Sequence, residues 1–243
     1  MKMCRERPGG SPAVNETNGH FMKIGIFSDV HADLDSLNRA LKLMENKGAD
    51  RLLCAGDLVD GDTEGDAAAQ RVKNLNIPVV MGNHDLAFSQ PRGVRWMQDI
   101  APLLYKKNPD DRVSIDTANY LASLPHPLEI QLDEKWFLLA HGSPWDLASY
   151  VFPTAGSHHK LRRIAHDYPD VDVVILGHTH VPMAAQVGSL WIFNPGSVER
   201  NRYSFDRTCA MLDTSNMDYR VYDIDTGSET TLERVTLTLD SDS

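Results

Sequence analysis

Residues 23–31 read KIGIFSDVH, so a short apolar segment leads directly into an aspartate and a histidine two positions apart. The apolar part has the length of a buried strand, and the polar residues would follow its carboxyl end. Four later segments repeat this arrangement. In open α/β sheets, binding sites form just beyond the carboxyl ends of the strands. The sequence therefore predicts one convergent site, built from strands at 23–27, 51–55, 77–81, 136–140 and 171–176.

Length and composition indicate a single large globular domain. The chain has 243 residues, of which 42% are hydrophobic and 24% charged, values close to those of globular proteins. Apolar runs such as 136–140 and 171–176 fall far short of the ~20 residues that a membrane span requires. The formal net charge of −10 disfavours a stable nucleic-acid partner, because binding to the phosphate backbone relies on basic groups. Association of copies of the chain is left open.

The N-terminal segment and the cysteines suggest that the protein works in a reducing compartment. Residues 1–21 contain no apolar stretch of the kind that secretion signals carry, and they are interpreted as a flexible extension before one domain at 22–243. The three cysteines, Cys4, Cys54 and Cys209, are too scattered for a disulfide framework. We therefore expect a cytoplasmic protein.

Helices are expected between the early strands. Asp33 can cap a helix that places Leu37, Leu41 and Met44 on one face and stops near Gly48. Further helices are expected at 67–75 and 157–166. Later segments pair as hairpins, 128–132 with 136–140 and 209–213 with 219–223, while 230–239 would either add an edge strand or fray. This order predicts a mixed α/β architecture with a hairpin-rich second sheet.

The polar residues at the strand ends form a candidate metal site. If the strand conformation continued, residues two apart would project the same way. Three oxygen ligands and four imidazoles exceed the needs of one ion, so two ions sharing a bridging carboxylate are expected. Mixed nitrogen and oxygen ligands without thiolate suit Mn, Fe, Co, Ni or Zn, and Mn is our first choice. The candidate ligands are Asp29, His31, Asp57, Asn83, His141, His178 and His180.

The motifs, taken in order, resemble those of a known family. Asp-x-His at 29–31, Gly-Asp at 56–57, Gly-Asn-His-Asp at 82–85, His-Gly at 141–142 and Gly-His-Thr-His at 177–180 are similar to the calcineurin-like metallophosphoesterase superfamily. The likeness is greatest to its small bacterial and archaeal phosphodiesterases. It implies a four-layer α/β/β/α sandwich with two mixed β-sheets, a binuclear metal centre, and in-line attack on phosphorus by a hydroxide that bridges the metals.

The resemblance also implies roles for individual residues. The first metal would be held by Asp29, His31, Asp57 and His180, and the second by Asp57, Asn83, His141 and His178. His84 would lie near the leaving-group oxygen as a catalytic residue, oriented by Asp85. Asn194 begins a motif at 194–197 that would line the site and contact substrate.

One departure from the family pattern narrows the activity. Serine/threonine phosphatases and diadenosine tetraphosphatases carry Gly-Asp-x-Val-Asp-Arg-Gly at the second motif, whereas this chain has Gly61 at the arginine position. The predicted function is therefore hydrolysis of a small phosphate ester by a phosphodiesterase. The alternatives are a phosphomonoesterase or protein phosphatase, a dinucleoside polyphosphate hydrolase, and a non-catalytic scaffold, which would be expected to have lost ligands. A DNA nuclease is a further alternative, which the acidic charge and the lack of a second domain disfavour.

Other side chains have two interpretations each. His158 and Arg162 belong to a basic run on the helix expected at 157–166, which either faces solvent or contacts substrate phosphate. Trp145, Tyr150 and Phe152 follow the His141 motif closely. They would either form a wall of the pocket or pack locally.

Overall fold

The first sheet has four strands and contains the apolar segment 23–27. The computed structural model describes residues 21–60, 64–89, 113–199 and 206–239. Within this part of the chain, β1 is Lys23–Phe27 and β2 is Arg51–Cys54, and the two strands are parallel. β8 (Thr208–Asp213) pairs antiparallel with β1, and β9 (Asp218–Asp223) pairs antiparallel with β8. The strand order is β2-β1-β8-β9.

The second sheet has six strands in the order β10-β6-β7-β5-β4-β3. It contains two hairpins, β3–β4 and β6–β7, and parallel pairs between β4 and β5, β5 and β7, and β6 and β10. The mixed, hairpin-rich second sheet is therefore confirmed. The strands are β3 (Leu128–Leu132), β4 (Lys135–Leu139), β5 (Val173–Ile175), β6 (Met183–Val187), β7 (Leu190–Asn194) and β10 (Glu233–Leu237).

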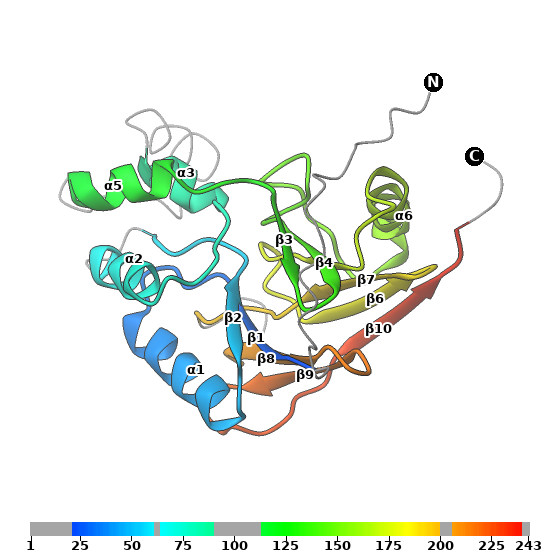
Figure 1. Cartoon of the computed structure of the whole chain (residues 1–243). Helices are drawn as coiled ribbons and strands as arrows, with labels where there is room; N and C mark the ends of the chain where they lie inside the picture. Colours follow the sequence, from blue (N-terminus) through cyan, green and yellow to red (C-terminus); the bar gives the residue numbers. More distant parts are fainter. Residues whose placement is uncertain (1–20, 61–63, 90–112, 200–205, 240–243) are drawn as a thin grey trace, which may run out of the picture.

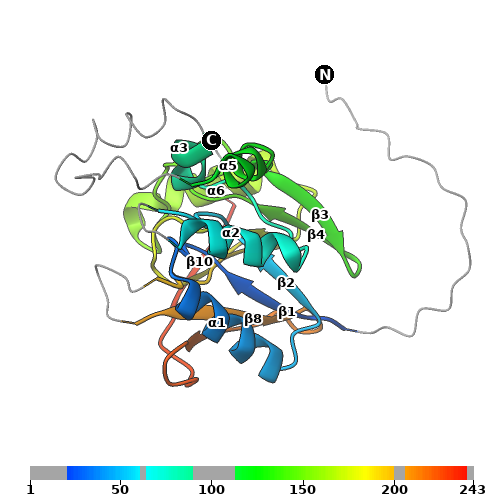
Figure 2. The same ribbon diagram turned by 90° about the vertical axis from the view of Figure 1, so that its left-hand side faces the viewer.

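Helices cover the outer faces of both sheets. Figure 1 shows α1 (Leu34–Asn46), α2 (Gly65–Asn74), α3 (Asn83–Ser89) and α5 (Ile115–Ala122) on one side. The short helix η1 (Ala155–Ser157) and α6 (His158–Asp167) lie on the other side. In Figure 2, α1 and α2 lie in front of β1 and β2. Together the elements form the predicted four-layer α/β/β/α sandwich.

Three apolar cores hold these layers together. Ile24 and Ile26 of β1 pack with Phe137 and Ile175 between the two sheets. One cluster joins the first sheet to α1, α2, α3 and α5, and another joins the second sheet to α6. Because successive side chains of a strand point to opposite faces, a strand between two layers must be apolar on both faces. This explains the continuous apolar segments in the sequence.

Helix α1 begins and ends where its sequence predicts. The Asp33 carboxylate accepts a hydrogen bond from the Ser36 backbone N–H at 2.9 Å, which satisfies a free donor of the first turn. Leu37 and Met44 are buried against the sheet. Gly48, just past the helix, has φ +80°, a backbone conformation that glycine adopts without strain.

Some elements differ from the sequence predictions. Residues 77–81 form no strand, and a single bridge joins Val79 to Cys54. Pro78 has no N–H to donate, so it offers only its carbonyl, which accepts from Cys54 N at 3.0 Å. Helices α3 and α5 were not predicted. At the other end, β10 confirms that residues 230–239 contain an edge strand.

Two expectations fall wholly or mainly on residues that the structure leaves out. The expected extension lies outside the described residues apart from Phe21, and Gly61 also lies outside them. Within the described ranges, no helix has both the length and the apolar character needed to cross a bilayer.

Candidate metal centre

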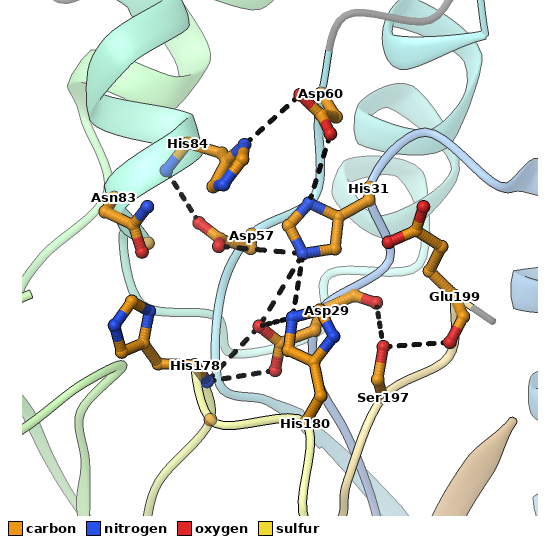
Figure 3. Close-up of polar contacts among 12 residues, drawn as sticks. Asp29, His31, Asp57, Asp60, Asn83, His84, His178, His180, Ser197 and Glu199 are labelled. Atoms are coloured by element: carbon orange, nitrogen blue, oxygen red, sulfur yellow. Dashed lines mark hydrogen bonds and ion pairs between the residues drawn. The ribbon is translucent and has the colours of Figure 1, made fainter. Parts of the chain in front are cut away.

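The candidate ligands come together at one edge of the sandwich, where strands of both sheets end. Asp29 and His31 follow β1, and Asp57 follows β2. The remaining candidates come from the other sheet or from a helix start: His141 follows β4, His178 and His180 follow β5, and Asn83 begins α3. Figure 3 shows most of this cluster. Segments more than 140 residues apart in sequence are in direct contact, since His31 and His180 are separated by 149 positions.

Asp29, His31 and His180 form the first group of donors. His180 Nε2 lies 3.2 Å from Asp29 Oδ1, and His31 Nε2 lies 3.8 Å from the same oxygen. The two imidazole Nε2 atoms face each other at 3.2 Å. Single donor atoms of the three residues all lie within 4.8 Å of one another, close enough for one ion to contact them all after small movements.

The second group consists of Asp57, His141 and His178, whose donor atoms also lie within 4.8 Å of one another. His141 Nε2 lies 3.0 Å from Asp57 Oδ2 and 3.0 Å from Asn83 Oδ1. The opposite nitrogen, His141 Nδ1, lies 2.7 Å from the Ala55 carbonyl oxygen, to which it donates. This bond orients the ring and leaves Nε2 available as a ligand.

The donor set fits divalent metal ions. His178 Nε2 is buried and has no hydrogen-bond partner among the described residues, which is costly for a polar atom unless it binds something else. Asp57 Oδ2, which contacts His141, also lies 3.8 Å from His31 Nε2, so this carboxylate lies between the two groups. That is the position that a ligand shared by two ions would need.

The local electrostatics favour a bound cation. Burial alone would raise the pKa of Asp29, but His180 and His141 outweigh it and lower that pKa to about 2. Burial alone would lower the pKa of His141, but Asp57 and Asp29 raise it to about 9. At neutral pH the carboxylates of Asp29 and Asp57 are therefore charged, because His141 also lowers the pKa of Asp57. His141 holds a proton that a metal ion would displace. By contrast, burial lowers the pKa of His178 to about 4, which keeps this imidazole neutral.

The loops that carry the ligands have an unusual backbone. We expected Asp29 and His31, and likewise His178 and His180, to project together because the strand conformation would continue. Instead β1 and β5 end first, and these four residues have positive φ values of 56°, 46°, 67° and 59°. Such a conformation costs a non-glycine residue about 1–2 kcal/mol. The side chains converge through these left-handed turns, and strained residues of this kind concentrate at functional sites.

Two glycines of the motifs allow other chain segments to approach closely. A Cβ atom at Gly82 would lie 2.0 Å from Asp57 Oδ1, and one at Gly177 would lie 2.1 Å from Ser28 Oγ. Both distances are far below van der Waals contact. The glycines beside the ligands are therefore a steric requirement of the site.

His84 lies at the rim of the cluster, but its carboxylate partner is not the expected one. Its Nδ1 lies 3.2 Å from Asp60 Oδ1, and its backbone N–H donates to Asp57 Oδ1 at 2.8 Å. Burial alone would lower the pKa of His84, but Asp57 and Asp60 raise it. Sequence reasoning missed Asp60. The only available signal was its position three residues after Asp57 in the Gly-Asp-x-Val-Asp pattern.

Asp85 performs a different task from orienting His84. Its Oδ2 accepts from the backbone N–H groups of Asp57 and Gly82, both at 2.9 Å, and its Oδ1 accepts from Leu58 N at 2.8 Å. The side chain is fully buried. Asp85 therefore joins the start of α3 to the loop after β2, and it acts on the site by holding Asp57 and Asn83 in place.

Asn194 is bonded to the loop that carries two of the candidate ligands. Its Nδ2 donates to the Gly177 carbonyl at 2.8 Å and to Thr179 Oγ1 at 3.1 Å, while its Oδ1 accepts from Gly196 N at 2.9 Å. The residue is 0% exposed. These bonds fasten Asn194 to the loop that carries His178 and His180, whereas its contact with substrate stays a prediction.

The hydrogen bond that the structure shows for Arg162 of α6 does not lead to the ligand cluster. Arg162 Nε donates to the Thr238 carbonyl at 3.4 Å, beside the edge strand β10. His158 is half-buried at the first position of α6. The substrate role of both residues stays a prediction. Tyr150, in contrast, lies against His178 with ring centroids 4.3 Å apart, so this aromatic residue does border the site.

Comparison with known proteins decides the family. Residues 22–217 match the model of the calcineurin-like phosphoesterase superfamily domain. The chain belongs to the calcineurin-like phosphoesterase superfamily. The predicted family, and with it a metal-dependent phosphoester hydrolase, is therefore confirmed, and the scaffold alternative is set aside.

Curated relatives and solved structures agree with this membership. A protein of Methanocaldococcus jannaschii named as a phosphodiesterase is 24% identical over 82% of this chain and 97% of its own length. The phosphodiesterase YfcE of Escherichia coli is 25% identical over 79% of this chain and 88% of its own length. A metallophosphoesterase from Sphaerobacter thermophilus superposes with a TM-score of 0.63 at 23% identity, over 84% of this chain and 88% of that chain, and shows the same fold.

Proposed function

We propose that this calcineurin-like phosphoesterase is a phosphodiesterase that uses two divalent transition-metal ions, with Mn²⁺ as the preferred ion. The observation that supports two ions best is the pair of donor groups with Asp57 between them. Asp29, His31 and His180 would hold one ion, and Asn83, His141 and His178 the other, with Asp57 shared. The two relatives named as phosphodiesterases support the diester specificity.

The side chains of the site would have different roles in the reaction. Bound divalent ions would supply an activated water and neutralise charge on the phosphoryl oxygens. His84, whose Nδ1 lies 3.2 Å from Asp60 Oδ1, would act on the leaving-group oxygen through its imidazole. Because Asp57 and Asp60 raise the pKa of His84, this imidazole can carry the proton that a departing alkoxide or phenoxide needs. Asp85 and Asn194 hold the ligand loops in place.

The direct test compares two chromogenic substrates. After chelator treatment and reconstitution with Mn²⁺, hydrolysis of bis(p-nitrophenyl) phosphate and of p-nitrophenyl phosphate would be measured on the wild type, Asn83→Ala and His84→Ala. The matched control is His166→Ala, because the His166 side chain is 85% exposed on α6. We expect a metal-dependent rate that is higher for the diester.

The two site variants should fail in different ways. Asn83→Ala should bind less metal and lose activity, since it removes a ligand. His84→Ala should keep its metal content but lose about 10²–10⁴-fold in kcat, the range expected for loss of general acid catalysis. A higher rate with the monoester than with the diester would indicate a phosphomonoesterase instead. Full activity in His84→Ala would remove its proposed role.

A further inference from the structure

A hollow of about 540 Å³ lies directly beside the candidate metal centre. Its volume falls within the range of small-molecule sites, about 300–1,000 Å³. Asn83 forms part of its wall, and the Oδ1 of this residue lies 3.0 Å from His141 Nε2 in the second donor group. His126, another wall residue, accepts a hydrogen bond from His141 N at 3.1 Å. The hollow therefore begins where the cluster of ligands ends.

Most of the wall is apolar. Leu86 comes from α3, Leu124 from the segment before β3, and Trp145 and Leu147 from the loop after β4. Leu86 and Leu147 are only half-buried, and neither belongs to one of the three apolar cores. Leucines left outside the cores beside a hollow gain free energy when an apolar ligand removes them from water. The wall is thus suited to an apolar partner.

The charge of the wall argues against an anionic occupant. The described residues that line the hollow include no lysine or arginine, and their one carboxylate is Asp146. That carboxylate is fixed in the loop by a bond from Ala148 N at 2.9 Å. Among the described residues of the wall, a second phosphate placed here would meet a negative charge and no cation. An uncharged group would not be repelled by the Asp146 carboxylate and would need no cation.

We propose that this hollow binds the second ester group of a phosphodiester, and that it selects an uncharged apolar or aromatic group. The inference rests on the proposed function and makes it more specific. When phosphorus lies at the metal centre, one of its two ester substituents extends past Asn83 between Leu86 and Leu147. Dinucleoside polyphosphates, whose second substituent is itself a phosphate chain, would be poor substrates.

The experiment uses p-nitrophenyl diesters that differ only in the second group, which is methyl, phenyl or 2-phosphonoethyl. Each kcat/KM would be divided by the rate constant for alkaline hydrolysis of the same ester, which removes differences in intrinsic reactivity. We expect the phenyl ester to exceed the methyl ester by about tenfold or more, the usual size of discrimination in an apolar pocket. The phosphonoethyl ester should not exceed the methyl ester.

Variants locate this preference in the hollow. Leu147→Trp fills the hollow and Leu147→Asn makes its wall polar, so both should bring the corrected phenyl-to-methyl ratio close to one. The control is Leu75→Trp, because Leu75 is 42% exposed and borders a different hollow between α1 and α2. Its ratio should equal that of the wild type. Unchanged ratios in both Leu147 variants would overturn the proposal, as would a preference for the phosphonoethyl ester.

A binding measurement separates this proposal from the proposed function. Titration calorimetry of the Mn²⁺-loaded His84→Ala variant, which should keep its metal but hydrolyse esters slowly, with diphenyl phosphate and dimethyl phosphate reports on binding in the hollow; Leu147→Trp is tested in the same background. Tighter binding of diphenyl phosphate that is lost in Leu147→Trp supports the hollow even if no ester is hydrolysed, in which case only the proposed function fails. Hydrolysis of the diesters with equal binding and equal rates would keep the proposed function and reject the hollow.

Discussion

Asn194→Ala separates a positioning role for this residue from the substrate contact that the sequence suggested. The substitution removes three hydrogen bonds from a fully buried site. It leaves the Gly196 N–H without its partner, and an unpaired buried group costs about 1–3 kcal/mol. The Gly177 carbonyl loses the Asn194 bond, worth about 0.5–1.5 kcal/mol, but keeps the bond from Thr179 N at 2.7 Å. Thr179 Oγ1 retains the bond from Val181 N at 3.3 Å and adds little. We expect the free energy of unfolding to fall by about 3 kcal/mol.

The measurement is urea unfolding followed by circular dichroism, carried out in chelator so that metal binding does not contribute. In a chain of this size a loss of about 3 kcal/mol corresponds to a fall in Tm of roughly 6–12 °C. Asn38→Ala is the matched control, because Asn38 is exposed on α1 and surface changes are usually within about 0.5 kcal/mol.

The substrate-contact interpretation predicts the opposite pattern. Asn194→Ala would then unfold at the same urea concentration as the wild type and would differ only in a higher KM. Unaltered stability in chelator would therefore refute the positioning role. A destabilised variant that also binds Mn²⁺ more weakly would show that the 177–180 loop depends on this amide.

Three further outcomes are expected. Gly82→Ala places a Cβ 2.0 Å from Asp57 Oδ1, so the Kd for Mn²⁺ should rise at least about tenfold, which is about 1.4 kcal/mol. Equilibrium dialysis with atomic absorption measures this Kd, and an unchanged value would contradict the steric argument. Asp60→Asn removes the charge that faces His84 and should lower kcat about 10–100-fold without changing metal content, whereas an unchanged kcat would show that the pair is not needed. Chelator should abolish activity while circular dichroism still shows a folded protein, because the apolar cores lie outside the ligand cluster; Mn²⁺ at 100 times its Kd should then raise stability by about 2.7 kcal/mol per site. Cooperative unfolding on chelation alone would show that the metal holds the fold together.

Much of the fold could be predicted from local sequence. Segments such as 23–27 are apolar on both faces, which indicates strands between two layers, and Asp33 with Gly48 delimits a helix. The failures have local causes as well. Residues 77–81 are apolar enough for a strand, but Pro78 cannot donate in a ladder. Helix α3 begins within the motif at 82–85 and has only 7 residues, too few for a helical spacing of apolar residues to show.

The candidate site, too, could be predicted only in part from the sequence. The residue types and their places after strands predicted Asp29, Asp57 and the histidine ligands, because chain direction alone brings strand ends to one edge. The predicted backbone of the ligand loops was wrong. We expected the strand conformation to continue, whereas turns with positive φ bring the side chains together. Asp60 was missed because nothing in the linear sequence relates it to His84, 24 residues later.

The sequence alone determined which chemical groups are available and at which ends of which strands they lie. Those properties depend on residue type and short-range periodicity, both of which can be read locally. Only the tertiary structure decided the surroundings of each group: it joins Asp85 to backbone amides and Asn194 to the 177–180 loop, and it places Leu86 and Leu147 in the wall of one hollow. Such partnerships depend on distances between segments far apart in the chain, and a hydrogen bond or apolar contact changes within a few tenths of an ångström.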